Sequence, residues 1–306
     1  MTRRSWIQFL VLSALWGASY LFIKVALEDV SPAMVVFART ALATLVLLPF
    51  ALRSGALDAL RGRPGTVAIL ALVQVAAPFL LISVGEQELS SSLTGILVAT
   101  APIFSFLLAI RLEREARAEG AAMLGVAVGI AGVILLLGID AGGGSAALIG
   151  GSMVVLASLG YALGAFYLRR NLSDAQPIGV VASAMGASAL MTAPLAAATF
   201  PSQAPDLETF GSLFVLGVGG TGIAFLLFYT LIAEVGPTRS SLVAYVAPGF
   251  SVLYGVLLLD ESFTAATFAG LVLILGGSWL AAEGRLPWQP KKAVRVAARP
   301  APEAAR

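Results

Sequence analysis

Long apolar runs dominate the chain, and short polar stretches separate them. Ten runs can be marked, each close to the ~20 residues that a helix needs to cross a bilayer. Because peptide groups in lipid must find hydrogen-bond partners within the protein, we expect helices. The runs are continuously apolar and about twice too long for the alternating strands of a membrane barrel. The predicted spans are 6–27, 32–52, 65–85, 89–110, 120–139, 146–168, 177–199, 209–233, 237–259 and 265–283.

One motif occurs in both halves of the chain. Residues 93–106 read LTGILVATAPIFSF, and residues 239–252 read RSSLVAYVAPGFSV. In each copy an Ala-Pro pair interrupts a predicted span, and Phe and Ser follow at the same spacing. The repetition indicates that spans 4 and 9 are cognate elements of a duplicated protein.

The halves also match where they begin. Residues 12–24 align with residues 157–169, which places Lys24 opposite Arg169. Since five spans per half is an odd number, the second copy must enter the membrane from the opposite side. We therefore expect an all-α membrane protein of two inverted five-helix repeats. The repeats are assigned to residues 1–140 and 146–284.

Composition supports a membrane protein and restricts its chemistry. The chain is 58% hydrophobic and 12% charged, against about 25% charged residues in an average soluble domain. It has no Cys and no His, which removes thiol nucleophiles, histidine acid–base catalysis and the usual zinc and haem ligands. We expect no cofactor, no metal and no enzymatic activity.

Charged residues are sorted between the two ends of the predicted spans. One set of ends holds all but two of the 19 basic residues, and the other set holds only acidic ones. The positive-inside rule then places both termini in the cytoplasm. The basic residues are spread over short loops, so we expect no nucleic-acid partner. Residues 285–306 are basic and rich in Pro and Ala, which predicts a disordered cytoplasmic tail. The acidic ends carry Glu28, Asp29, Glu86, Glu88, Asp140, Asp206, Glu208, Asp260 and Glu261.

Pro102 and Pro248 are the paired prolines of the repeated motif. A proline removes a backbone donor and clashes one turn back, so each is expected to bend its helix. One interpretation is a pair of hinges or gates facing a cavity. The other is a packing kink of the kind that membrane helices tolerate.

Polar and aromatic residues inside the spans are candidates for substrate binding. An amide in hydrocarbon is costly unless it is paired or hydrated, and Trp and Tyr normally collect at the membrane interfaces instead. Together they would suit a ligand with an apolar or aromatic body, although ordinary aromatic packing is the alternative for each. The candidates are Trp16, Tyr20, Gln74, Pro78, Tyr161, Phe225, Tyr229 and Tyr245.

Lys24 and Arg39 are the two basic residues within spans. Either can neutralise a substrate carboxylate or pair with Glu28, Asp29 or Glu86, and Lys24 can instead extend to the interface. No Asp or Glu lies at the centre of a span, so exchange of a proton for a cationic drug has no obvious residue. Proton coupling through carboxylates at span ends stays open.

Small residues recur at helical spacing, as in Gly125 and Gly129 of span 5 and Gly160 and Gly164 of span 6. Such residues allow close helix approach. Packing within one chain and a dimer face are the two interpretations. We expect a monomer in the bilayer, with a dimer as the alternative.

Several segments in order resemble the EamA-type branch of the drug/metabolite transporter superfamily. They are LSALWGASYLFIKVAL at the start, FARTALA in span 2, ATAPIFSFLLAI in span 4 and YVAPGFSVLYGVLLLDES in span 9. The resemblance covers roughly residues 6–284. It implies a helical basket around a central cavity lined by spans 1, 3, 4, 6, 8 and 9. It also implies export of metabolites, and the aromatic amino acid exporters of this branch are a comparison.

The resulting hypothesis is a secondary transporter in the cytoplasmic (inner) membrane. It would export amino acids or related small metabolites by alternating access between the two repeats. Transport of nucleotide sugars or drugs is the first alternative. A membrane sensor or enzyme is the second, but the loops are too short for an output domain, and clustered catalytic side chains are missing.

Overall fold

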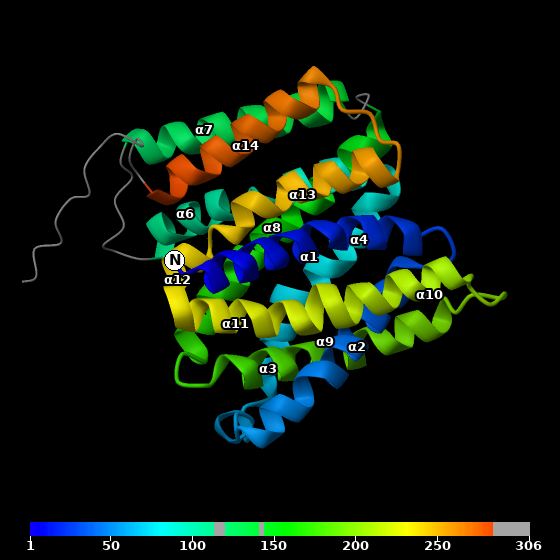
Figure 1. The fold of residues 1–306 in the computed structure, drawn as a ribbon, viewed down its shortest axis with the longest axis vertical. Coiled ribbons are helices and arrows are strands. Elements are labelled where there is room, and N and C mark those ends of the chain that lie inside the picture. The colour runs from blue at the N-terminus through cyan, green and yellow to red at the C-terminus, as the bar shows by residue number, and fades with distance from the viewer. Residues whose placement is uncertain (113–119, 141–143, 284–306) are drawn as a thin grey trace, which may run out of the picture.

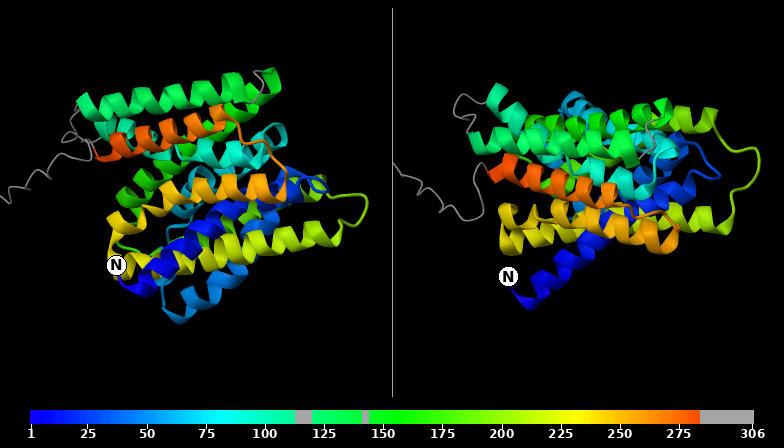
Figure 2. Two further views of the ribbon diagram at one scale, coloured as in Figure 1. Left: turned by 45° about the horizontal axis from the view of Figure 1, so that its top comes forward. Right: turned by 90° about the horizontal axis from the view of Figure 1, so that it is seen from above.

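The computed structural model describes residues 1–112, 120–140 and 144–283. Within these residues the regular structure is entirely helical (Figures 1 and 2). The first half contains α1 (Arg3–Ala26), α2 (Pro32–Arg53), η1 (Asp58–Leu60), α3 (Pro64–Ala71), η2 (Leu72–Ala76), α4 (Ala77–Glu88), α5 (Ser91–Val98), α6 (Ala101–Leu112), α7 (Gly120–Leu135) and η3 (Leu136–Asp140). The second half contains α8 (Ser145–Asn171), α9 (Pro177–Ala198), α10 (Leu207–Phe214), η4 (Val215–Ile223), α11 (Ala224–Val235), α12 (Pro237–Ser240), α13 (Val243–Leu258) and α14 (Ala265–Glu283).

The helices lie side by side, and their connections collect at two opposite ends of the bundle. The N-terminus, the α2–α3 connection and α12 lie at one end in Figure 1, and the connections before α10 and α14 lie at the other. Large apolar side chains cover much of the outer surface, including Leu45, Leu190 and Leu257, whose exposed fractions are 69%, 78% and 66%. An apolar exterior of this kind is suited to lipid.

Nine helical stretches of the described chain are long and apolar enough to cross a membrane. The ninth predicted span, 237–259, is not one continuous helix. α12 ends at Ser240, and α13 is a shorter apolar helix of 16 residues. Backbone bonds from Ala244 to Ser241 and from Tyr245 to Leu242 close tight turns between them. The predicted tail, residues 285–306, lies outside the described residues.

Several helices begin at residues that the sequence marks as caps. The side-chain oxygens of Ser31, Ser90 and Asp206 each accept a hydrogen bond from the backbone N–H three residues on. Pro32 occupies the first turn of α2, where its missing N–H costs nothing. Local capping therefore sets the starts of α2, α5 and α10.

Pro102 coincides with a break between α5 and α6. Its missing N–H leaves the carbonyl of Val98 without the helical donor, and Ser158 of α8 donates to that carbonyl at 3.2 Å. Ser278 of α14 donates to the neighbouring carbonyl of Ala99 at 2.6 Å. Hydroxyls from the second half of the chain thus satisfy the backbone that the proline releases.

The glycines of span 5 pack within the chain. A Cβ on Gly125 would lie 2.5 Å from the backbone N of Ala281, and one on Gly277 would lie 2.6 Å from the carbonyl O of Gly125. Gly129 likewise faces Gly277. The small residues therefore bring the backbones of α7 and α14 into direct contact.

This contact predicts that Gly277→Leu strongly destabilises the protein, because the new side chain would meet backbone atoms that cannot move aside. We expect a loss of about 1–3 kcal/mol or more in unfolding free energy, seen as a lower thermal midpoint of the purified protein in detergent. Gly276→Leu is the matched control, since nothing lies within 4 Å of its Cβ position. Equal midpoints for the two variants would contradict the packing argument.

Candidate functional site

A cavity of about 500 Å³ lies among α3, η2, α4, α8, α9 and α11. Aromatic and aliphatic side chains form most of its wall. The cavity extends to Arg169, Ser173 and Pro177, which are exposed where α8 connects to α9. That connection lies at the end of the bundle that carries the N-terminus (Figure 1). The cavity therefore runs from one end of the bundle into its interior.

Four of the eight predicted binding residues line this cavity: Gln74, Tyr161, Phe225 and Tyr229. The rings of Phe225 and Tyr229 lie 6.2 Å apart on α11, and Tyr161 meets the edge of Phe79 at 6.5 Å. The wall thus brings together aromatic side chains of both halves of the chain and one amide.

A π-helical segment positions Gln74. Pro78 cannot donate to the carbonyl four residues earlier, which belongs to Gln74, and the chain widens into η2 just before it. The side chain of Gln74 packs against Gly164 of α8, where a Cβ would collide with it. Pro78 itself contacts Gly160 of the same helix. Two glycines of span 6 therefore make room for the irregular part of span 3.

The other predicted aromatic residues lie elsewhere. Trp16 packs behind the cavity wall, with its ring 6.1 Å from Phe225 and 5.1 Å from Phe228. Tyr245 borders a separate groove with Trp6 and Trp279. Tyr20 of α1 packs against the cluster around Ile23. Spans 3, 6, 7 and 8 supply the lining, and the described residues of spans 1, 4 and 9 do not, so Pro102 and Pro248 also lie outside it.

Arg39 lies directly behind the cavity wall. Its guanidinium carbon is 3.9 Å from the ring centroid of Phe79, a cavity residue. Its Nε donates to Thr221 Oγ1 at 2.8 Å. Thr221 Oγ1 in turn donates to the carbonyl of Leu216, a bond that spans the π-helical η4. Arg39 is 9% exposed, so stacking and one hydrogen bond hold a cation within the bundle.

Lys24 has a structural partner. Its Nζ donates to the backbone carbonyls of Glu86 and Leu89, both at 2.8 Å. These carbonyls belong to the C-terminal end of α4, where unpaired acceptors and the helix dipole favour a cation. Lys24 thus ties α1 to the end of span 3.

An exposed ion pair stands beside the cavity mouth. Arg63, which precedes α3, donates to Asp174 through two nitrogens, at 2.9 Å each. This bond holds the pKa of Asp174 below its ordinary value. Both side chains are well exposed, so the pair contributes little to stability. It links the first half of the chain to the α8–α9 connection.

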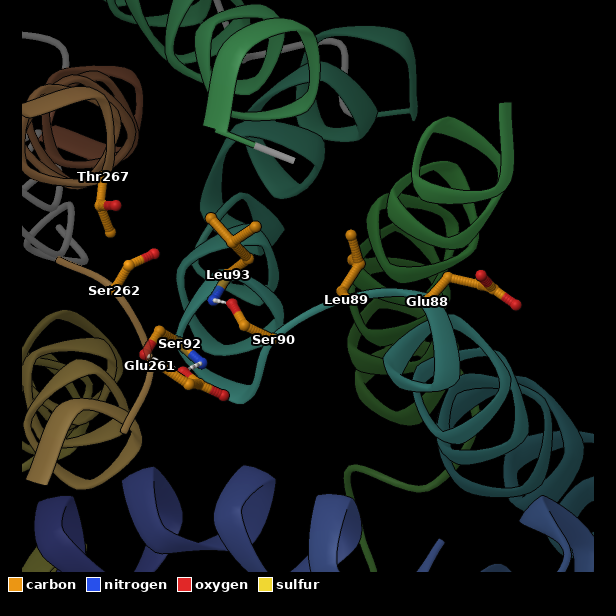
Figure 3. Close-up of a pocket in the computed structure, with 8 residues that line it drawn as sticks. All are labelled: Glu88, Leu89, Ser90, Ser92, Leu93, Glu261, Ser262 and Thr267. Carbon is orange, nitrogen blue, oxygen red and sulfur yellow. Dashed lines mark hydrogen bonds between the residues drawn. The ribbon is translucent and has the colours of Figure 1, made fainter. Parts of the chain in front are cut away.

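Glu261 is a functional candidate that the sequence placed only among the acidic loop residues. Its carboxylate accepts hydrogen bonds from the backbone N–H groups of Ser91, at 2.6 Å, and Ser92, at 3.0 Å, and from the Ser92 hydroxyl. Figure 3 shows Glu261 beside Ser92. Gly255 leaves the space for it, because a Cβ there would collide with the carboxylate. A residue of the α13–α14 connection therefore caps the N-terminus of α5, and span 9 is joined to span 4 at this end. The serine-rich start of α5 was the available signal.

Glu261→Gln should weaken this cap, because a neutral amide cannot accept all three hydrogen bonds and presents donors to donors. We expect a loss of about 1–3 kcal/mol, measured as a lower thermal midpoint in detergent. Glu88→Gln is the control, since Glu88 borders the same small cavity of about 260 Å³ but is exposed. A similar loss in both variants would argue against the cap.

Comparisons with known proteins agree with this architecture. The chain is 28% identical to an uncharacterized inner membrane transporter, YedA, of Escherichia coli, over 92% of this chain and 91% of the relative. It is 25% identical to an uncharacterized transporter of Archaeoglobus fulgidus, over 92% of this chain and all of that one. A probable amino-acid metabolite efflux pump of E. coli is 24% identical, over 97% and 99% of the two chains.

One solved crystal structure shares the fold, with a TM-score of 0.65 at 20% identity over 92% of this chain and 97% of the other. The EamA-like transporter family matches twice, over residues 4–138 and 148–282. The two matches cover nearly the whole chain and confirm the resemblance seen in the sequence. This multi-pass membrane protein belongs to the EamA-like transporter family.

Proposed function

We propose that this transporter exports amino acids or related small metabolites by alternating access. The observation that carries the proposal is the aromatic cavity that contains Gln74 and opens at one end of the bundle. At about 500 Å³ it lies within the ~300–1,000 Å³ typical of small-molecule sites. The similarity to a probable amino-acid metabolite efflux pump supports the same class of substrate.

The charge distribution supports loading from the cytoplasm. The cavity mouth includes Arg169 and lies at the end that carries described basic residues such as Arg4, Arg63 and Arg239 (Figure 1). By the positive-inside rule this end faces the cytoplasm. The proposed orientation in the inner membrane therefore has both termini in the cytoplasm. An opening on this side is the state in which an exporter takes up its substrate.

The packing between the halves supports two inverted repeats, residues 1–140 and 146–284, that form a basket around a central cavity. Helices of cognate spans pack on each other: α2 on α9, α5 on α13, and α7 on α14. The contact of α4 with α8 has its counterpart in the contact of α1 with α10 and α11. Such pairing is what a twofold relation between repeats requires, and it allows two states of similar energy.

Cognate residues occupy different environments, as alternating access requires of any single state. Lys24 is bonded to the end of α4 at the end opposite the mouth, whereas its cognate Arg169 is exposed at the mouth. Pro102 follows a break in its helix, whereas Pro248 lies inside the continuous α13. We interpret the structure as open at the cytoplasmic end and closed at the other, with Glu261 and Lys24 among the closing contacts.

Arg39 is the better candidate for a substrate carboxylate. Lys24 already binds two backbone carbonyls. Arg39 instead stacks on Phe79, which is a residue of the cavity wall. A guanidinium recognises carboxylates through paired hydrogen bonds that lysine cannot reproduce. Among the described residues that line the cavity none is acidic, which disfavours the alternative of a cationic drug.

The experiment is counterflow of labelled amino acids, nucleotide sugars and cationic drugs into proteoliposomes. Gln74→Ala and Tyr229→Ala should each raise KM for the transported substrate roughly 5–10-fold, the value of one lost hydrogen bond or aromatic contact. Arg39→Lys should raise KM most for substrates that carry a carboxylate. Tyr245→Ala is the control and should leave KM unchanged, because Tyr245 lies in a separate groove.

Absence of saturable flux for every compound, from folded wild-type protein, would refute the proposal. If only nucleotide sugars or drugs are transported, they are the substrate class in place of amino acids. Equal increases in KM for Tyr229→Ala and Tyr245→Ala would contradict the proposal that the cavity binds the substrate.

The paired prolines generate a separate prediction. If a proline at this position of spans 4 and 9 is needed for the change of state, Pro102→Ala and Pro248→Ala should slow turnover several-fold with KM nearly unchanged. Pro194→Ala in α9 is the control, since this proline lies inside a helix but outside the repeated Ala-Pro motif. Wild-type turnover in both variants would assign the prolines to packing.

A further inference from the structure

Glu86 carries a carboxyl group that is buried inside the bundle. It lies near the C-terminal end of α4 and is 0% exposed. Neither of its carboxylate oxygens has a hydrogen-bond partner among the described residues. An ionised carboxylate in a low-dielectric interior costs several kcal/mol unless it is paired. The side chain must therefore gain a proton or a partner at some stage.

The packing around Glu86 is tight. The preceding residue, Gly85, meets α8 so closely that a Cβ there would lie 2.5 Å from the carbonyl O of Gly150. The neighbouring side chain of Ile82 is 2% exposed. Glu88, two residues further along α4, is exposed instead.

The nearest cation is engaged elsewhere. Lys24 Nζ donates to the backbone carbonyls of Glu86 and Leu89 and to no carboxylate oxygen of Glu86. If this were a permanent salt bridge, the ammonium would bond the carboxylate, which is the stronger acceptor. The arrangement fits a neutral carboxyl beside a lysine that has turned to the backbone.

The remaining charged and titratable neighbours come from every side. Glu86 interacts electrostatically with Lys24 and Tyr20 of α1, with Arg39 of α2 and with Glu261 of the α13–α14 connection. Tyr161 of α8 joins them through its interactions with Arg39 and Tyr20. The packed segments η2 and α5 contain no titratable side chain.

We propose that Glu86 is a proton-binding site that couples transport to a proton gradient. A proton from water forms an O–H bond with one carboxylate oxygen and returns to water when the bond breaks. When the proton leaves, the ammonium of Lys24 moves from the α4 carbonyls to the carboxylate. The consequence for coupling depends on the proposed transport function, whereas proton binding itself does not.

Glu261 supplies the link to the closed end of the bundle. Glu86 and Glu261 repel each other when both are ionised, and Glu261 holds the α13–α14 connection on α5. Protonation of Glu86 removes the repulsion and leaves Lys24 bonded to α4, so it favours closure. Loss of the proton draws Lys24 away from the α4 carbonyls and restores the repulsion of Glu261. Both changes favour opening at this end.

The first test needs no substrate. Infrared difference spectra of the purified protein in lipid, recorded from about pH 5 to about pH 9, where buried carboxyls titrate, should show the carbonyl band of a protonated carboxyl that disappears as pH rises. The band should be absent in E86Q and present in E88Q. Isotopic labelling of glutamate carboxyl carbons should shift it, which keeps the test valid if E86Q does not fold.

The second test uses proteoliposomes and whichever amino acid the counterflow assay identifies. A pH gradient should accelerate wild-type and E88Q flux several-fold, and the ratio of flux with and without the gradient should fall to unity in E86Q. No titrating band, or a band that E86Q retains, would overturn the proton site. An unchanged flux ratio in E86Q would overturn the coupling. Absence of wild-type flux would refute the transport proposal and leave the infrared result to decide the proton site.

Discussion

Every peptide group that leaves a helical ladder inside a bilayer must find a partner within the protein. This constraint explains several contacts between spans that are distant in the sequence. At the break before Pro102, hydroxyls of Ser158 and Ser278 bond the released carbonyls. At the end of α4, Lys24 bonds the last acceptors, and at the start of α5, Glu261 accepts from the first donors. Irregular backbone and contacts between spans therefore coincide.

The same constraint gives the π-helical segments a role. In η2 the widened turn precedes Pro78 and places Gln74 in the cavity wall. In η4 it directs the hydroxyl of Thr221 to Arg39. Spans 3 and 8 thus each carry a π-helical segment. Because η2 and η4 are already irregular, these segments lose fewer regular α-helical hydrogen bonds when their neighbours move.

Aromatic stacking and close helix packing divide the interior into two regions. One is the cavity with Tyr161, Phe225 and Tyr229, which reaches the basic end. The other is the sealed contact of α4 with α8 at Gly85 and Gly150, where Glu86 lies. Arg39 stands between them, stacked on the cavity side and electrostatically linked to Glu86. Substrate and proton would then act on one connected set of side chains.

The sequence by itself determined the helical class, nearly all of the span boundaries and the family. Hydropathy is a local property, because each run of apolar residues responds to lipid independently of its neighbours. The sequence also placed Gln74, Tyr161, Phe225 and Tyr229 among its eight candidates, since polar and aromatic residues in mid-span are conspicuous. Only the tertiary structure decided that Tyr245 lies in another groove and that Lys24 binds the C-terminal end of α4 and Glu261 the N-terminal end of α5. It also decided that the Glu86 carboxylate has no hydrogen-bond partner among the described residues. These roles depend on atoms brought together from distant parts of the chain, and a one-dimensional pattern contains no record of such contacts.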